Sequence, residues 1–184
     1  MGDFGAKKFT AKNGEGFTVR TALPNDAAQV LTLNKAIFAE APYLLTTQAE
    51  FTITPEQEQQ FLQQTLDAPG KIALVAATET EIIAFLHFEN GHRQRIQHQG
   101  TLSMSVKREF RNEGVGTALL KSLLEWAETN PLIEKVCLEV FADNIPAINL
   151  YKTLGFTEEG LKKRAIKKSN HDYHDLVLMA RFVD

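Results

Sequence analysis

The sequence predicts one domain of the α/β (α+β) class, in which strands outnumber helices but the two kinds of element mix along the chain. A chain of 184 residues with 43% hydrophobic content is long enough for one substantial core. Short apolar or alternating runs, typical of strands, lie between longer runs whose apolar residues recur at helical spacing. The sequence contains no internal repeat, low-complexity tract or linker that would divide it. We therefore expect a single domain over residues 17–184.

The first segment, residues 1–16, carries glycines and lysines without a clear hydrophobic period. It is expected to be a loose leader or a poorly formed first strand. Alternating apolar and polar residues over 17–22 then predict a strand, and the turn-forming residues at 24–26 follow it. A first helix is predicted after this turn from the spacing of Val30, Leu33, Ile37 and Phe38.

A second helix is predicted to begin at Thr54, which suits the N-cap, with Pro55 at the first helical position. A Pro-Gly pair ends it before residue 71. Two apolar runs, 72–77 and 82–89, then predict a β-hairpin. The residues between these runs include no glycine, so the sequence leaves the turn type open.

The second half of the chain continues to alternate between strands and helices. The helix over 114–128 is the strongest in the chain, because Val115, Leu119, Leu123 and Trp126 recur at helical spacing. The elements predicted after residue 100 are a strand at 101–106, this helix, a strand at 136–141, a helix at 145–154 and two closing strands at 161–166 and 175–182.

Composition argues against several classes of protein. The formal net charge of −3 lacks the basic excess that draws a protein onto nucleic acid or anionic lipid, so neither is an expected partner. No stretch reaches the roughly 18 apolar residues of a membrane span, and the N-terminal residues do not resemble a signal peptide. Cys137 is the only cysteine and lies in an apolar run typical of a buried strand. We expect a cytoplasmic protein without disulfides.

The connection before the strongest helix has the features of an anion-binding turn. Glycines at 114 and 116 let the backbone approach a ligand, and the start of the helix presents unpaired N–H groups and the positive end of its dipole. Such a turn suits a pyrophosphate. Arg111 adds a positive charge, and Asn112 tolerates a left-handed backbone. A helix that merely begins with two glycines is the alternative.

A second informative segment begins about thirty residues later. Asn144 suits an N-cap, Pro146 is tolerated in a first helical turn, and Gly155 stands where a helix often ends in a left-handed residue. A short helix is thus bounded at both ends. Tyr151, near its end, is either a reactive phenol or an aromatic side chain that packs on the sheet.

Taken together, the two segments resemble the GNAT superfamily of N-acetyltransferases. The acyl-CoA loop of that family reads Arg or Gln-x-x-Gly-x-Gly or Ala, and a later segment reads Asn-x-x-Ala-x-x-Leu-Tyr-x-x-x-Gly-Phe. The order and separation of the two motifs match as well. The matching residues are Arg111, Gly114 and Gly116, then Asn144, Ala147, Leu150, Tyr151, Gly155 and Phe156.

The resemblance implies a mixed, mostly antiparallel sheet of about seven strands flanked by about four helices. It also implies that strand 101–106 splays from strand 136–141 and that acetyl-CoA lies in this cleft. The pantetheine arm would meet the backbone near positions 104 and 106, and the pyrophosphate would meet the amides of residues 111–117. The implied acetyl-CoA-binding residues are Met104, Val106, Arg111, Asn112, Gly114, Val115, Gly116, Thr117, Asn144 and Asn149.

The resemblance further implies acetyl transfer by direct attack of an amine in a ternary complex. Tyr151 would give a proton to the departing CoA thiolate. The first candidate for the base that deprotonates the amine is Glu89, at the end of a predicted strand. Glu139, His98 and His174 are alternatives, and proton loss through water is another.

The sequence departs from the family pattern at Glu113, where an acidic side chain in the loop would oppose anion binding unless it points away. We interpret Glu113 as stabilising the start of the helix. His87, His92 and His98 lack the spacing of a metal site, so no metal is expected.

The acceptor is left open by the sequence. The C-terminal pattern is similar to that of bacterial members of the family that act on small amines, amino acids or protein N-termini. A homodimer formed through this region is conceivable. The alternative to an enzyme is a non-catalytic acyl-CoA sensor or interaction module, because a fold alone does not establish activity.

Overall fold

The computed structural model describes residues 3–40 and 43–183 of the chain. Strands and helices mix within one sheet-centred architecture, so the predicted α/β (α+β) class is confirmed. The strands are β1 (Ala6–Thr10), β2 (Gly16–Thr21), β3 (Lys71–Ala77), β4 (Ile82–Asn90), β5 (Gln99–Val106), β6 (Lys135–Phe141), β7 (Thr157–Ser169) and β8 (Asp172–Phe182). The α-helices are α1 (Ala27–Glu40), α2 (Pro55–Asp67), α3 (Val115–Thr129) and α4 (Ile145–Thr153).

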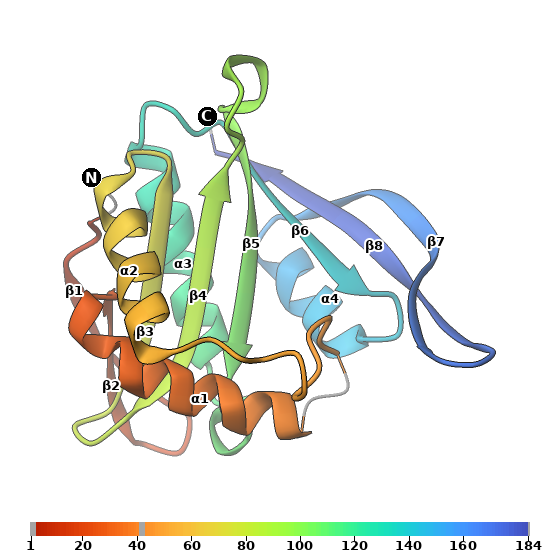
Figure 1. Ribbon diagram of the computed structural model, residues 1–184. Coiled ribbons are helices and arrows are strands. Elements are labelled where there is room, and N and C mark those ends of the chain that lie inside the picture. The colour runs from red at the N-terminus through yellow and green to blue at the C-terminus, as the bar shows by residue number, and fades with distance from the viewer. Residues whose placement is uncertain (1–2, 41–42, 184) are drawn as a thin grey trace.

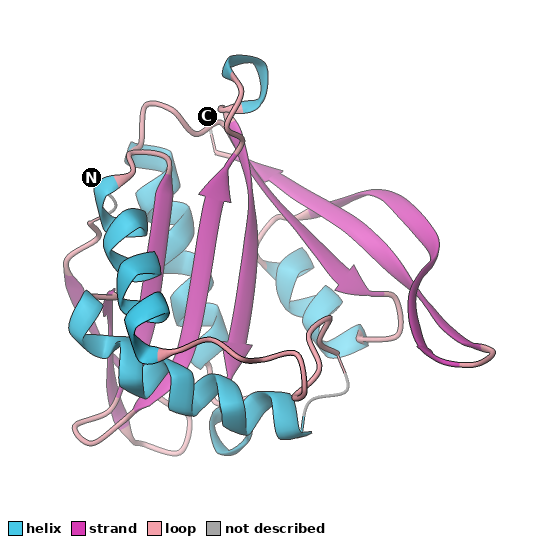
Figure 2. Ribbon diagram, viewed as in Figure 1, coloured by secondary structure: helices cyan, strands magenta, loops and turns pink. Residues whose placement is uncertain are grey.

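All the strands belong to one eight-stranded sheet of order β1-β2-β3-β4-β5-β6-β8-β7 (Figure 1). Neighbouring strands run antiparallel except β5 and β6, which are parallel. Figure 2 shows α1 and α2 in front of the first half of the sheet, while α3 lies behind it and α4 lies beside β6 and β8. Within the described residues, no helix has the length and apolar content needed to cross a membrane.

The core lies on both faces of the sheet. On the face covered by α3, buried side chains of β3 and β4 pack with the apolar face of that helix. On the opposite face, Val30 and Leu33 of α1 and Leu62 of α2 pack against Ala73 and Val75 of β3. Strand β3 is thus covered on both faces, which explains why its sequence is continuously apolar rather than alternating.

The N-terminal segment contains a strand that the sequence predicted only as one of two alternatives. Strand β1 pairs with β2 from Ala6 opposite Arg20 to Thr10 opposite Gly16. The rings of Phe9 and Phe17 stack with their centroids 5.6 Å apart. This strand brings the sheet to eight strands where about seven were expected.

The predicted boundaries of most other elements agree with the structure to within a few residues. Thr54 caps α2 through its hydroxyl, which accepts a hydrogen bond from the Gln57 amide. The hairpin turn between β3 and β4 is organised by Thr78, whose hydroxyl accepts a hydrogen bond from the Glu81 amide. The Thr78 side chain thus stabilises a turn that contains no glycine.

The closing hairpin is longer than the predicted strands at 161–166 and 175–182. Strand β7 forms the edge of the sheet and is exposed along most of its length, so its sequence does not show the alternation from which a strand is recognised. Its register with β8 shifts at three places, and Arg164 adopts a left-handed backbone (φ 51°) at one of them. Figure 1 shows this ribbon projecting beyond the other strands.

Strands β5 and β6 are paired over only part of their length. Their parallel register runs from Gln99 opposite Lys135 to Thr101 opposite Cys137 and then stops. Beyond this point the two strands diverge, as Figure 1 shows. The splayed strand pair that the resemblance implied is therefore present.

Candidate active site

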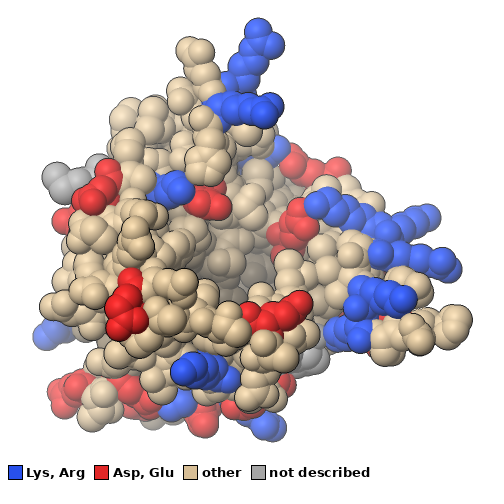
Figure 3. All heavy atoms as spheres, viewed as in Figure 1, with Lys and Arg blue, Asp and Glu red and all other residues tan. Residues whose placement is uncertain are grey.

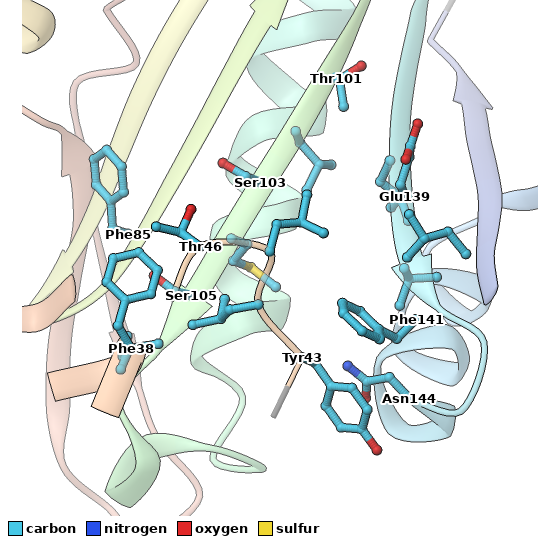
Figure 4. A pocket seen from close by; sticks show the side chains of 18 of the residues that line it. Phe38, Tyr43, Thr46, Phe85, Thr101, Ser103, Ser105, Glu139, Phe141 and Asn144 are labelled. Carbon is cyan, nitrogen blue, oxygen red and sulfur yellow. The ribbon is translucent and has the colours of Figure 1, made fainter. Parts of the chain in front are cut away.

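The gap between the diverging strands opens into a cavity of about 500 Å³. Figure 3 shows the hollow in the middle of this face of the molecule. In Figure 4, Ser103 and Ser105 of β5 lie across the gap from Glu139 and Phe141 of β6. Helix α1 and residues 43–46 cover one side, and α4 contributes Asn144 and Tyr151. Of the two segments recognised in the sequence, the second lines the cavity, and the loop before α3 lies next to it: a Cβ added to Gly116 would lie 3.4 Å from Met104 Cε and 3.6 Å from Leu150 Cδ2.

The loop before α3 has a backbone suited to an anion. Asn112 and Gly114 both have left-handed φ values, 64° and 93°, and a Cβ added to Gly114 would meet no atom within 4 Å. The first intrahelical hydrogen bond is donated by the Ala118 amide to the Gly114 carbonyl, at 3.0 Å. Within the described part of the chain, the amides of residues 112–117 donate to no protein acceptor. These amides and the dipole of α3 provide the donors that a pyrophosphate requires.

Two charged side chains of this loop differ in what they contact. Arg111 donates from Nε to the Val106 carbonyl at 3.0 Å, which holds the exposed guanidinium beside the end of β5. Glu113 turns away from the loop: its Oε2 accepts from the Asn13 amide at 2.8 Å, and its carbonyl accepts from the Lys12 amide at 3.1 Å. The prediction that Glu113 stabilises the helix start is wrong, since α3 begins at residue 115 and Glu113 instead anchors the turn between β1 and β2.

The residues predicted to contact acetyl-CoA around this loop differ in what they can offer to a ligand. The side chain of Met104 lines the cavity, and a Cβ added to Gly116 would lie 3.4 Å from the Met104 Cε. Val115 is fully buried in the core, so only its amide faces the loop, and Thr117 is half-buried in the first turn of α3. The carbonyl of Val106 already accepts from Arg111, which limits what it can offer to a ligand.

The second segment folds as its sequence predicts. Asn144 caps α4, its side-chain oxygen accepting from the Ala147 amide at 3.4 Å, and it also lines the cavity. Gly155 takes a left-handed φ of 83° after the helix ends. Asn149 lies on the exposed side of α4, outside the cavity lining.

Tyr151 reaches the cavity from the buried side of α4. Its residue is 8% exposed, and its ring packs edge-on against Phe156 with the centroids 5.8 Å apart. Burial raises the pKa of the Tyr151 phenol to about 12, so the phenol stays protonated at neutral pH. The lining of the cavity therefore includes a phenol that keeps its proton at neutral pH.

Glu89, the first candidate for the base, lies outside the cavity lining and is not brought together with Tyr151. Its carboxylate pairs with Lys71 at 3.1 Å, at the ends of β3 and β4. Burial raises the pKa of Glu89, but the hydrogen bond and charge of Lys71, with the charges of His87 and His92, lower it further, to below its ordinary value. A carboxylate stabilised in this way is a weaker base.

Glu139 lies in the lining of the cavity, on the strand opposite β5. Its side chain is 39% exposed and pairs with Lys162 of β7. The other base candidates lie outside the lining: His174 contacts Asp143 and Asp172 at 3.3 and 3.2 Å, and His98 lies in the connection before β5. Of the candidates considered from the sequence, Glu139 is the one that shares the cavity with the Tyr151 phenol.

A second cavity of about 480 Å³ adjoins the first and was not predicted. It is bounded by α2, β4 and β5, and it contains His87 and Glu58. A signal for it was present in the polar side chains at alternate positions of β5, where Ser103 and Ser105 occur on an inner strand. A polar stripe under covering helices indicates a hydrated cavity rather than core. No group of three or more metal-ligating side chains occurs in the described ranges.

Comparisons with known proteins agree with this geometry. Residues 19–177 match the family model described as "Acetyltransferase (GNAT) domain". The L-amino acid N-acetyltransferase AaaT of Escherichia coli K12 is 34% identical over 116 residues, which cover 62% of this chain and 70% of that protein.

Two solved structures share the fold. A GNAT-family acetyltransferase from Streptococcus pneumoniae superposes with a TM-score of 0.87 at 25% identity, covering 91% of this chain and 99% of that one. The acetyltransferase YncA from Salmonella typhimurium, solved with acetyl-CoA, superposes with a TM-score of 0.80 at 18% identity, covering 91% and 94%.

Proposed function

Since the chain belongs to the GNAT family of acetyltransferases, we propose that its first cavity is where an acetyl group passes from acetyl-CoA to a primary amine. The family expected from the two motifs is confirmed, and the chain is an acetyl-CoA-dependent N-acetyltransferase. The acceptor classes considered are a small amine, an amino acid and a protein N-terminus. The observation that carries the proposal is that Tyr151 lines the cavity between β5 and β6.

Donor binding would use the backbone more than side chains. The free amides of residues 112–117 suit the pyrophosphate of acetyl-CoA, and Arg111 adds positive charge beside them. The pantetheine arm carries amide groups that suit the edge of β5 after Thr101, where pairing with β6 has ended. Met104 and Gly116 would border this arm, with Asn144 on the opposite wall.

The reaction requires one bond to form and one to break. The nitrogen lone pair of the neutral amine attacks the thioester carbonyl carbon, the C–N bond forms, and the C–S bond breaks with its electrons leaving on sulfur. Tyr151 lines the cavity, and its hydroxyl would donate its hydrogen to that sulfur. With a pKa of about 12, the phenol holds this proton through the neutral range, and the same burial also makes a thiolate more basic.

The attacking amine must first lose a proton, because an alkyl ammonium of pKa near 10.4 is only about 0.04% neutral at pH 7. Glu139 is our candidate acceptor for this proton, directly or through a water, since it lines the cavity. Glu89 lies outside the cavity lining and would have to act through water; both carboxylates are paired with a lysine, so their place relative to the cavity is what separates them. Proton loss to water alone is the remaining route.

The test is to follow free thiol while the protein is incubated with acetyl-CoA and a panel of amines. Release of thiol that depends on the amine supports the proposal. Tight acetyl-CoA binding without thiol release from any amine would support the sensor instead. Glu139→Gln and Glu89→Gln are a matched pair of carboxylate changes for the base: we expect kcat/KM to fall about a hundredfold in the first and little in the second. The reverse result would assign the base to Glu89.

A further inference from the structure

The second cavity lies on the face of the sheet covered by α1 and α2, and it adjoins the first. Asn34 of α1, Phe85 of β4 and Ser103 of β5 line both of them. These shared residues mark where an acceptor whose amine lies in the first cavity would extend its remaining atoms into the second. The charged and polar groups that line the second cavity determine which charge the far end of the acceptor can carry.

Glu58 places a carboxylate in this cavity from the inward face of α2. It shares that face with Leu62 and Thr65, at the spacing of a buried helical stripe, and it is 4% exposed. No cation in the described ranges pairs with it, and burial alone raises the pKa of its carboxyl. A carboxylate at a buried helix position without a partner is unfavourable for folding. Such a group is expected where a ligand supplies the missing partner.

His87 faces the same cavity from β4. Its ring packs against Phe61 of α2 with the centroids 4.8 Å apart, and its Nε2 is buried without a hydrogen-bond partner among the described residues. Burial lowers the pKa of His87 to about 4, so the imidazole is neutral at pH 7 and adds no positive charge to the cavity. It offers a hydrogen bond to a ligand without repelling a cation.

The lining of both cavities is free of Lys and Arg among the described residues. Lys71, the cation that acts on His87, is paired with Glu89 at the end of β4. A negatively charged group on the acceptor would find a carboxylate and no cation here, and its burial would be costly. A positively charged group would find the Glu58 carboxylate and the faces of Phe61 and Phe85.

We propose that the second cavity binds the far end of the acceptor and selects amines that carry a second cationic group, with Glu58 as its counter-ion and His87 as a hydrogen-bond partner. The inference rests on the proposed function, because it concerns the acceptor of that reaction. It names diamines and similar dications as the substrate class. The L-amino acid N-acetyltransferase to which the chain is similar is named for an acceptor with an α-carboxylate. Such an acceptor would find no lysine or arginine in either lining here, so the proposed acceptor differs from it.

The experiment compares three acceptors that share one primary amine and a four-carbon chain and differ in the group at the far end: 1,4-diaminobutane ends in an ammonium, butylamine in a methyl group and 4-aminobutanoate in a carboxylate. Longer homologues of each are measured in parallel, so that chain length does not limit the reach. We expect kcat/KM for thiol release to be highest with the diamine and lowest with the carboxylate. Equal values for the three would overturn the inference while leaving the acetyltransferase proposal intact. Thiol release with none of them, nor with any other amine, would instead count against the proposed function.

Glu58→Gln tests the counter-ion directly. Because a charge-assisted hydrogen bond is lost, we expect kcat/KM for the diamine to fall about tenfold and that for butylamine to stay the same. Glu56→Gln, an exposed change on the same helix, is the control and should alter neither value. A merely structural role for Glu58 would change both acceptors equally, and that result would refute the assignment.

Discussion

The sides of the cleft that we propose for the donor and for the acceptor present different kinds of groups: backbone on the one, side chains on the other. The donor side, between β5, α3 and α4, presents backbone groups: the amides of residues 112–117 and a strand edge left unpaired by the divergence of β6. The acceptor side presents side chains of α1, α2, β4 and the segment after residue 43, including Glu58 and His87. Backbone recognition needs a particular chain conformation and tolerates many side chains. Side-chain recognition needs particular residues and can therefore differ from one relative to the next.

This difference explains why one side can be recognised from a short motif and the other cannot. Glycines at left-handed positions and an N-cap residue can be recognised from the residue type at one position of the sequence. Glu58 and His87 are separated along the chain and meet only because α2 packs on β4. Three variants test how far the two sides are independent.

The largest effect is expected on the donor side, from Gly114→Val. A β-branched residue is strained at a φ of 93°, and the loop must rotate to relieve the strain, which turns its amides away from a common point. Loss of two charge-assisted hydrogen bonds would weaken acetyl-CoA binding about a thousandfold, measured by titration calorimetry.

Gly5→Val is the matched control for this variant. Gly5 also has a left-handed φ, 78°, and open space around its added Cβ, but it precedes β1. Gly5→Val should lower the free energy of unfolding about as much as Gly114→Val does, and it should leave acetyl-CoA binding unchanged. Equal losses of binding in both variants would show that Gly114 acts through general stability, not through the loop.

Tyr151→Phe should have the next largest effect, and it acts where the two sides meet. The ring would keep its contact with Phe156, so the fold and acetyl-CoA binding should be retained. Removing the proton donor should lower kcat about a hundredfold, measured by thiol release at saturating substrates. Tyr43→Phe, which removes another hydroxyl from the same cavity, should lower kcat far less. An unchanged rate in Tyr151→Phe would remove the phenol from the mechanism.

The last effect concerns the acceptor side and changes neither binding nor turnover directly: it appears as a pH dependence of stability. His87 has an ordinary pKa of 6.5 that burial lowers to about 4, so between these values the unfolded chain binds more protons than the folded one. The contribution of neutral His87 is fully present above pH 6.5 and is lost as the pH falls toward 4, by about 3 kcal/mol. His87→Gln should therefore flatten the decline in unfolding free energy over this range.

Denaturant unfolding at several pH values measures this effect. His92→Gln, in the connection after β4, is the control and should leave the wild-type slope unchanged. A His87→Gln variant that declines as steeply as the wild-type protein would show that the imidazole is not held neutral by burial.

Several parts of the fold and site were predictable because their signals are local. The caps at Thr54 and Asn144 and the left-handed Gly155 are each determined by the conformational preference of one residue. Strand β7 escaped full recognition because an exposed edge strand needs no alternation of polar and apolar residues. Strand β1 was ambiguous for a related reason: most of its residues are exposed.

Local sequence signals specify the order of most elements, the loop before α3 with its left-handed turns, and the place of Tyr151 on a short capped helix. Each depends on residues near one another in the chain, whose preferences act before any long-range contact forms. Tertiary structure alone decided that Glu139 and not Glu89 joins Tyr151 in the cavity, and that Glu113 turns toward Asn13. These outcomes depend on where β6 separates from β5 and on which strand end meets which partner, and packing over the whole sheet determines both.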